Sequence, residues 1–236
     1  MKTRSFLLLI LPGWLFSSCG VLQQSTLHGL RDGYFISKNE KGEKRKVYAT
    51  VSPDSLSIFP VSQKHLDTGQ VSTFPLLYGQ YRTRLPRFTL IQSSMDLDVT
   101  TVLFKYRFRN KDLPGQLNTN FNLSVYMGYK KEYFKFSNQH KPTGYFNRKL
   151  VHLSMDAGLF CGLGSTNMNS SVTSGRLSVE YDGLIWQKGV AVFFGWENIT
   201  IGLGLGFDGL LDKNRHYWIY QEKPWAGLMI GLTFSN

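Results

Sequence analysis

Alternation of apolar and polar residues with a period of two is the strongest pattern in this 236-residue chain, and it begins after residue 86. The runs 120–130, 151–164, 201–208 and 226–234 all carry apolar residues at every second position. Successive side chains of a strand point to opposite faces, so this period indicates strands with two unlike faces. We therefore expect an all-β fold.

Eight segments fit this strand pattern, and we expect them to pair as an antiparallel membrane β-barrel over 87–236. Most of them reach the roughly 9–11 residues that a tilted strand needs to cross a bilayer. Closure into a barrel would leave no unpaired sheet edge in lipid. The expected strands are 87–93, 97–108, 119–136, 148–164, 175–186, 189–197, 199–211 and 225–234.

The residues opposite the apolar ones predict which face points inward. Gly202, Gly204 and Gly206 alternate with Ile201, Leu203 and Leu205. Glycine gains nothing on the wet face of a sandwich, but it makes room inside a narrow barrel whose apolar face meets lipid. Charged residues in the same phase would then pair inside. The expected interior ion-pair network comprises Lys105, Arg107, Asp156, Arg176, Glu180, Asp182 and Asp208.

The carboxyl-terminal part resembles the small eight-stranded outer-membrane barrels, and Trp225 to Phe234 is similar to their terminal assembly strand. This resemblance covers residues 87–236 and implies an outer-membrane location, membrane lipid as a partner, and a monomer. Aromatic residues near the expected strand ends suit interfacial belts. These are Tyr129, Tyr133, Phe134, Phe136, Trp186, Trp196, Tyr217, Trp218, Tyr220 and Trp225.

The amino terminus has the pattern of an export signal. Basic Lys2 and Arg4 precede a short apolar stretch over 6–16, and Ser17, Ser18 and Cys19 follow. The stretch is shorter than the roughly 20 residues of a membrane helix. The run 15–20 resembles the lipobox of bacterial lipoproteins, which implies acylation of Cys19. Phe16 departs from the usual leucine, so cleavage at another position stays open.

The resulting organisation is a signal peptide over 1–18, a periplasmic tether and short β segment over 19–86, and the barrel over 87–236. Runs 32–36, 46–51 and 55–59 predict three short strands, while 60–86 reads as an irregular connection. The net charge is +11, and removal of Lys2 and Arg4 leaves +9. An exported chain with dispersed basic residues points to anionic head groups or glycans and away from nucleic acid.

Candidate catalytic residues are His152, Ser154 and Asp156, which share one strand face. Residues two apart on a strand lie about 7 Å apart, too far for direct hydrogen bonds, so a triad would need partners from other strands. We favour interior packing for them. No cofactor or metal site is expected, because Cys and His lack zinc spacing. Cys161 reads as a small apolar residue.

The predicted function is that of a lipid-anchored structural or surface-interaction protein of the outer membrane, without catalysis. Its loops at 137–147 and 212–224 would face outward and carry His140, Lys141, Arg215 and Tyr217 for contact with glycans or proteins. Two alternatives stay open. One is an envelope lipid-modifying enzyme that uses His152, and the other is a soluble periplasmic β protein that binds a ligand.

Overall fold

The computed structural model describes residues 29–62, 65–75, 81–110, 113–196 and 199–232. The predicted signal peptide, Cys19 and the first part of the tether lie outside these residues. The described chain is all-β, as the alternation predicts. Its strands are β1 (Gly33–Asn39), β2 (Lys44–Val51), β3 (Ser55–Ser62), β4 (His65–Leu66), β5 (Ser72–Pro75), β6 (Phe88–Arg107), β7 (Gln116–Asn118), β8 (Asn122–His140), β9 (Phe146–Met168), β10 (Tyr181–Trp196), β11 (Ile199–Leu210) and β12 (Pro224–Leu232).

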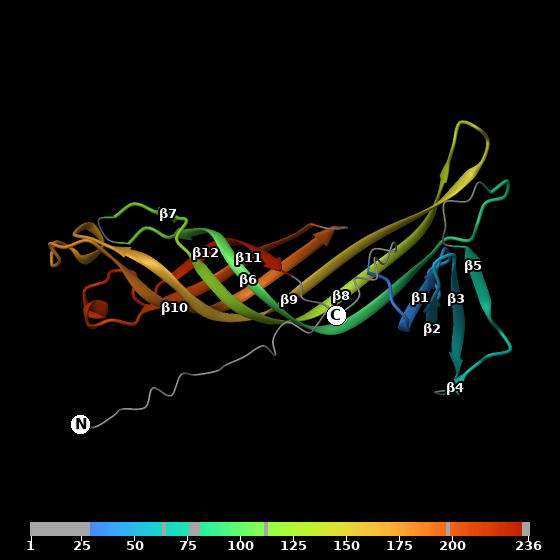
Figure 1. Ribbon diagram of the computed structural model, residues 1–236, viewed down its shortest axis with the longest axis horizontal. Helices are drawn as coiled ribbons and strands as arrows, with labels where there is room; N and C mark the ends of the chain where they lie inside the picture. Colours follow the sequence, from blue (N-terminus) through green and yellow to red (C-terminus); the bar gives the residue numbers. More distant parts are fainter. Residues whose placement is uncertain (1–28, 63–64, 76–80, 111–112, 197–198, 233–236) are drawn as a thin grey trace, which may run out of the picture.

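These strands form one 12-stranded antiparallel sheet in the order β12-β11-β10-β9-β8-β6-β1-β2-β3-β4 (Figure 1). β5 pairs with β3, and β7 pairs with β6. One further pairing joins β12 to β6, with Trp225 opposite Arg107 and Leu232 opposite Val99. The path β6-β8-β9-β10-β11-β12 therefore returns on itself, and we call it the strand ring.

Within the described residues the ring contains six strands, so the prediction of eight is corrected. The expected strands 87–93 and 97–108 are one strand, β6, whose ladder with β8 continues through Ser93, Ser94 and Asp96. The expected strands 175–186 and 189–197 are likewise replaced by β10, which begins at residue 181. Gly189 lies within its ladder, opposite Phe160 and Gly206. The polar stretches 94–96 and 187–188 were read as breaks, although paired backbone carries each strand through them.

The two ends of the ring differ. Three long connections, 108–121, 169–180 and 211–223, lie at one end of the ring, which we call the loop end. They include the short helices η1 (Ser171–Thr173) and η2 (Lys213–His216). The opposite end holds β1–β5, and there β10 and β11 are separated by only two residues. We call β1–β5, with the adjoining ends of β6, β8 and β9, the N-terminal unit. The division of the chain into domains at residue 86 stays a prediction.

The predicted outward loops lie at opposite ends, which corrects that expectation. The β8–β9 hairpin, whose last pair is His140 and Phe146, lies at the end of the N-terminal unit, whereas 211–223 lies at the loop end (Figure 1). Four strands were expected between the two loops, which would put them on one side. The structure has three, β9, β10 and β11, and an odd number of crossings reverses the side.

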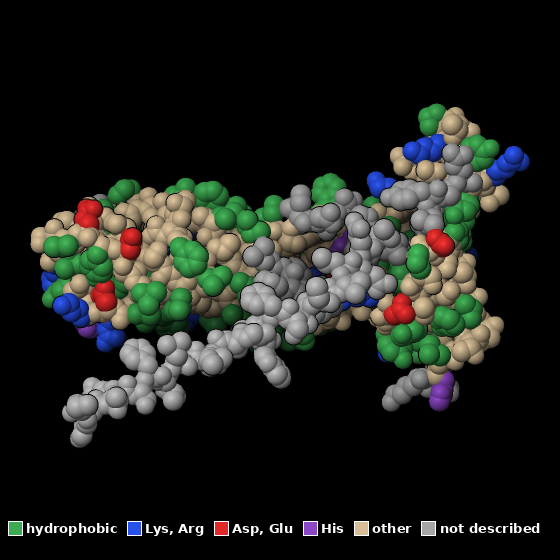
Figure 2. Space-filling model, viewed as in Figure 1, with side chains coloured by type: hydrophobic (Ala, Val, Ile, Leu, Met, Phe, Trp, Pro, Cys, Tyr) green, Lys and Arg blue, Asp and Glu red, His purple; other side chains and the backbone are tan. Residues whose placement is uncertain are grey.

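Large apolar side chains cover the outside of the ring, and charged ones lie inside it. Leu159 and Leu203 are 60% and 62% exposed, while Asp208 is 0% exposed. Figure 2 shows hydrophobic side chains along the visible outer face of the ring, with charged ones toward the loop end. Cys161 belongs to this outer face and is exposed. Adjacent residues of a strand point to opposite faces, so the residue that follows each outward-facing Leu points into the ring.

The interior is packed in layers. The middle of the ring holds an apolar cluster of Val102, Tyr126, Phe160, Ala191, Phe193, Trp225 and Met229. A second cluster closes the loop end with Met168, Val172, Ile185, Leu210, Trp218 and Tyr220. Large aromatic side chains therefore fill a space that small glycines leave on the facing strands.

The N-terminal unit has a separate core, to which the ring strands contribute. Phe88 and Leu90 of β6 and Phe134 and Phe136 of β8 pack against residues of β1–β3, such as Phe35. Phe88 and Phe136 stack at 4.7 Å between ring centroids. Buried Arg148 lies over both rings, and its burial lowers the pKa of the guanidinium to about 10. The region 60–86, expected to be irregular, contains the end of β3 with β4 and β5, because β3 extends to Ser62 and pairs with both.

Replacing Gly158 with alanine is expected to lower the free energy of unfolding by about 1–3 kcal/mol, the usual cost of overpacking. A Cβ at this position would collide with the Met127 carbonyl oxygen and the Gly128 Cα, which are backbone atoms and cannot rotate away. Gly231→Ala is the matched control, since its Cβ would have Phe193 Cε1 as nearest atom at 3.7 Å. Denaturant titration of both variants in detergent measures the difference. Equal stability of the two would contradict the close packing of β8 on β9.

Candidate functional site: the polar interior of the strand ring

A buried carboxylate on β11 is the centre of the polar interior. Asp208 accepts hydrogen bonds from Lys105 Nζ at 3.0 Å, Arg107 Nη2 at 2.6 Å and Trp225 Nε1 at 2.8 Å. The three donors come from β6 and β12, the strands that close the ring. This group therefore joins the last strand to the first through side chains as well as through the backbone ladder.

Neutral polar groups extend this group across the ring. Lys105 Nζ also donates to Asn122 Oδ1 and Gln187 Oε1, each at 3.1 Å, and Gln187 Nε2 donates to Ser124 Oγ at 2.6 Å. We call Lys105, Arg107, Asn122, Ser124, Gln187, Asp208 and Trp225 the Asp208 cluster. Its members come from β6, β8, β10, β11 and β12 and all are buried. Each lies in the inward phase of its strand, and the pairing register of the five strands brings them to one level of the ring.

The Asp208 cluster holds two cationic side chains and one carboxylate. Aromatic rings lie against both cations: Lys105 Nζ is 4.4 Å from the Trp225 ring centroid, and Arg107 Cζ is 4.7 Å from that of Trp218 and 5.2 Å from that of Tyr220. Ring faces attract a desolvated cation. The interior is therefore built to hold positive charge, with one carboxylate fixing both cations in place.

A second polar group lies nearer the N-terminal unit. Tyr126 donates a hydrogen bond of 2.6 Å from its hydroxyl to Asp156 Oδ1, and Lys130 Nζ lies 3.7 Å from Asp96 Oδ2. Asp156 is 6% exposed. The predicted network thus forms as two groups, with Lys105, Arg107 and Asp208 together in one and Asp156 in the other.

Three members of the predicted network are misplaced. Arg176, Glu180 and Asp182 are exposed. The first two precede β10, whose ladder with β9 starts at Tyr181 opposite Met168. The alternation at 175–182 is therefore not that of an interior strand face. Arg176 instead lies over the ring of Tyr217 in the loop-end connection, 5.3 Å from its centroid.

Sequence reasoning missed Asn122, Ser124 and Gln187 as partners and assigned Trp225 to an aromatic belt. Trp225 is 0% exposed and belongs to the Asp208 cluster. Trp218 and Tyr220 are also buried, as are Phe134 and Phe136 in the N-terminal unit. The signal that was missed is the position of Trp225 in the alternation. Ala226 and Leu228 belong to the outward-facing set of β12, so the odd-numbered Trp225 belongs to the inward-facing set.

His152, Ser154 and Asp156 do not form a triad. His152 Nε2 lies 3.0 Å from Glu132 Oε1 on β8, and its ring stacks on Phe134 at 4.6 Å. Asp156 instead accepts from Tyr126. The His152 ring is therefore held by two residues of β8, through a polar contact with Glu132 and stacking on Phe134. In the described part of the chain, no group of three or more His, Cys, Asp or Glu is placed to hold a metal.

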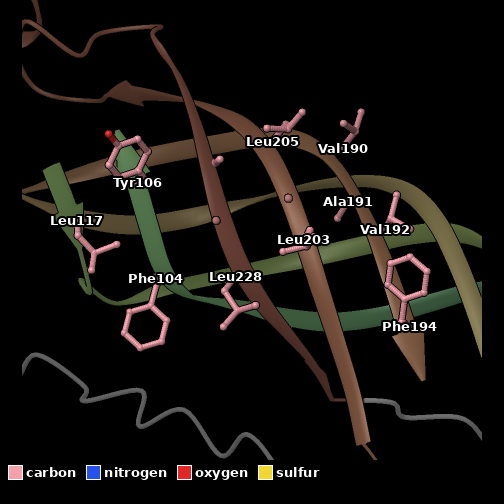
Figure 3. A pocket seen from close by; sticks show the side chains of 13 residues that line it. Phe104, Tyr106, Leu117, Val190, Ala191, Val192, Phe194, Leu203, Leu205 and Leu228 are labelled. Atoms are coloured by element: carbon pink, nitrogen blue, oxygen red, sulfur yellow. The ribbon is translucent and has the colours of Figure 1, made fainter. Parts of the chain in front are cut away.

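The outer face of β10–β12 is hollowed over its small residues. The hollow has a volume of about 690 Å³ and is lined by apolar side chains (Figure 3). Val190 and Val192 of β10, Leu203 and Leu205 of β11 and Leu228 of β12 border it, together with Phe104 and Tyr106 of β6. Apart from the Tyr106 hydroxyl, the side chains that line this hollow are apolar, so it is suited to contact with hydrocarbon.

Comparisons with protein-family models, curated proteins and solved structures find no match to this chain. Within the described residues, none of the helices has the length and apolar character of a membrane span.

Proposed function

We propose that the strand ring is a barrel embedded in a bacterial outer membrane, where it serves as a structural or surface-interaction protein without catalysis. Membrane lipid is its principal partner, the chain works as a monomer, and acylated Cys19 adds a second anchor. The N-terminal unit lies in the periplasm and the loop end faces the exterior. The observation that carries this proposal is the apolar outer face around a charged interior.

The continuity of this outer apolar face supports embedding. Outward residues on neighbouring strands, such as Leu159, Leu203 and Leu228, form one continuous surface, and the first two are more than half exposed. A monomer in water rarely exposes a connected apolar patch above roughly 600 Å². The outward apolar run on β9 extends from Leu153 to Leu163, which is 11 residues and enough to cross a thin apolar layer when tilted. Lipid is the solvent that such a surface matches.

The asymmetry of the ring supports its orientation. Outer-membrane barrels have short periplasmic turns and longer exterior loops. β10 ends and β11 begins at the end of the ring opposite the loop end, with only two residues between them in the sequence, whereas the longer connections gather at the loop end. A chain anchored at Cys19 in the inner leaflet would also keep β1–β5 on the periplasmic side.

The packed interior supports a structural role over transport. Phe160, Phe193 and Trp225 fill the middle of the ring, and the Asp208 cluster crosses it. A ring of six strands is narrower than one of eight, and eight already leave little more than room for side chains. Gly189 on β10 and Gly202 and Gly206 on β11 make the narrower ring feasible, because the rings of Phe160, Phe193 and Trp225 occupy the space beside them.

The full-length Cys19→Ala variant tests the proposal, because it removes the acyl anchor and leaves the outer face intact. We expect it to stay in the membrane pellet after carbonate extraction and to migrate differently on gels before and after boiling. The unsubstituted chain and a soluble periplasmic protein are the controls. Release of the variant into the supernatant would show that the acyl group alone held the chain, and the embedded-barrel proposal would fail.

A further inference from the structure

A polar hollow opens at the loop end of the ring, apart from the apolar outer face. Its volume is about 360 Å³, within the range of small-ligand sites. Buried Arg107, Trp218 and Tyr220 line one side of it. Side-chain amides line much of the rest, among them Asn118 on β7, Asn120, and Asn167 on β9.

The buried side of this hollow contains donors that lack protein partners. Arg107 donates a hydrogen bond from Nη2 to Asp208. Among the described residues, its Nε and Nη1 have no hydrogen-bond partner, and the Tyr220 hydroxyl has none either. The Arg107 side chain is 3% exposed. Burial raises the pKa of Tyr220, so its hydroxyl stays protonated and can donate at neutral pH. Buried polar atoms are nearly always paired, so three unpaired ones beside a hollow indicate a missing acceptor.

Charge indicates what kind of acceptor is missing. Arg107 and Lys105 share the single carboxylate of Asp208, which leaves the Asp208 cluster with an excess positive charge next to the hollow. A carboxylate accepts from a guanidinium through two oxygens and would balance this charge. The amides of Asn118, Asn120 and Asn167 suit hydroxyl groups, since each both donates and accepts.

We propose that the loop-end hollow binds a small acidic sugar, with its carboxylate toward Arg107 and Tyr220 and its hydroxyls toward the asparagine amides. This proposal assigns a ligand class to the surface-interaction role proposed above. It rests on that role, because the hollow is open to the exterior only if the loop end faces outward. The partner is thereby a uronate-bearing saccharide, free or as a unit of a surface polysaccharide.

Titration of the purified full-length chain in detergent tests this directly, with Trp218 near the hollow as an intrinsic fluorophore and calorimetry as a second measurement. D-glucuronate is expected to bind at least about tenfold more tightly than D-glucose, because only glucuronate carries the charge. Inorganic phosphate is expected to compete weakly. Equal binding of glucose, phosphate that displaces glucuronate at equal concentration, or no binding at all would each overturn the proposal.

Two variants separate binding from folding. Arg107→Lys keeps a cation for Asp208 but loses the guanidinium, and we expect glucuronate affinity to fall about tenfold or more. Asn120→Ala leaves the Asp208 cluster untouched and should weaken glucuronate and glucose alike. Gln139→Ala, an exposed amide on the β8–β9 hairpin at the other end, is the matched control. Unchanged affinity in Asn120→Ala would overturn the site even if Arg107→Lys failed to fold.

Failure of this inference differs from failure of the membrane proposal. Binding is measured on folded protein in solution, whereas embedding is measured by membrane extraction. A chain that stays in the membrane without binding glucuronate refutes only the site, and a chain that binds glucuronate but is extracted refutes only the embedding.

Discussion

Replacing Asp208 with asparagine is expected to lower the free energy of unfolding by about 3–5 kcal/mol, the range for breaking a buried ion pair on one side. The substitution keeps the size of the side chain but removes its charge. Lys105 and Arg107, 2% exposed each, would then lie buried without their carboxylate. Denaturant titration in detergent, followed by the heat-dependent gel shift, measures the loss.

Two further variants show whether the charge is responsible. Asp182→Asn is the matched control on an exposed carboxylate and should change stability by less than about 0.5 kcal/mol. In the double variant Lys105→Met with Asp208→Asn, one cation disappears together with the carboxylate, so part of the lost stability should return. An Asp208→Asn protein as stable as Asp182→Asn would mean that the buried cations do not depend on this carboxylate.

The sequence predicts which residues of each strand point into the ring, because successive side chains of a strand alternate between its two faces. Once Leu203 and Leu205 are taken as outward, Gly204 and Asp208 must be inward, as the structure has them. The same phase places Lys105 and Arg107 inside. Four of the seven predicted network residues, Lys105, Arg107, Asp156 and Asp208, therefore have the inward position that local alternation indicates.

The number of strands was not predictable in the same way. Polar residues interrupt a strand pattern, so 94–96 and 187–188 were taken as breaks. In the fold these positions are paired with neighbours distant in sequence, such as Gly128 opposite Asp96 and Phe207 opposite Lys188. Tertiary pairing decides at such positions, and a single sequence does not contain it.

Partner choice was the least predictable feature. The alternation along β9 shows that Asp156 and His152 lie on the same face. The register of β8 against β9 decides their partners: Tyr126 reaches Asp156, and Glu132 reaches His152. A shift of two residues would keep every face and exchange the partners. The Asp208 cluster has the same dependence, because its members come from five strands.

The substitution Leu203→Arg is expected to destabilise the embedded protein by about 2–4 kcal/mol and to reduce its assembly into membranes. Leu203 lies on the outer face of β11, paired with Val192 on β10 and Leu228 on β12, and it is 62% exposed. Little interior packing is lost with it. In water, an outward Leu→Arg change would therefore alter stability by no more than about 0.5 kcal/mol, so the size of the effect reports which solvent the face meets.

Val179→Arg is the control, because Val179 is 69% exposed but lies in the loop-end connection before β10. It should leave both the membrane-inserted fraction and the gel shift unchanged. Membrane fractions, heat-dependent mobility and denaturant titration in lipid vesicles compare the pair. If Leu203→Arg matched Val179→Arg in all three, the apolar face would not be in hydrocarbon, and a soluble β protein that covers this face with a partner would become the better account.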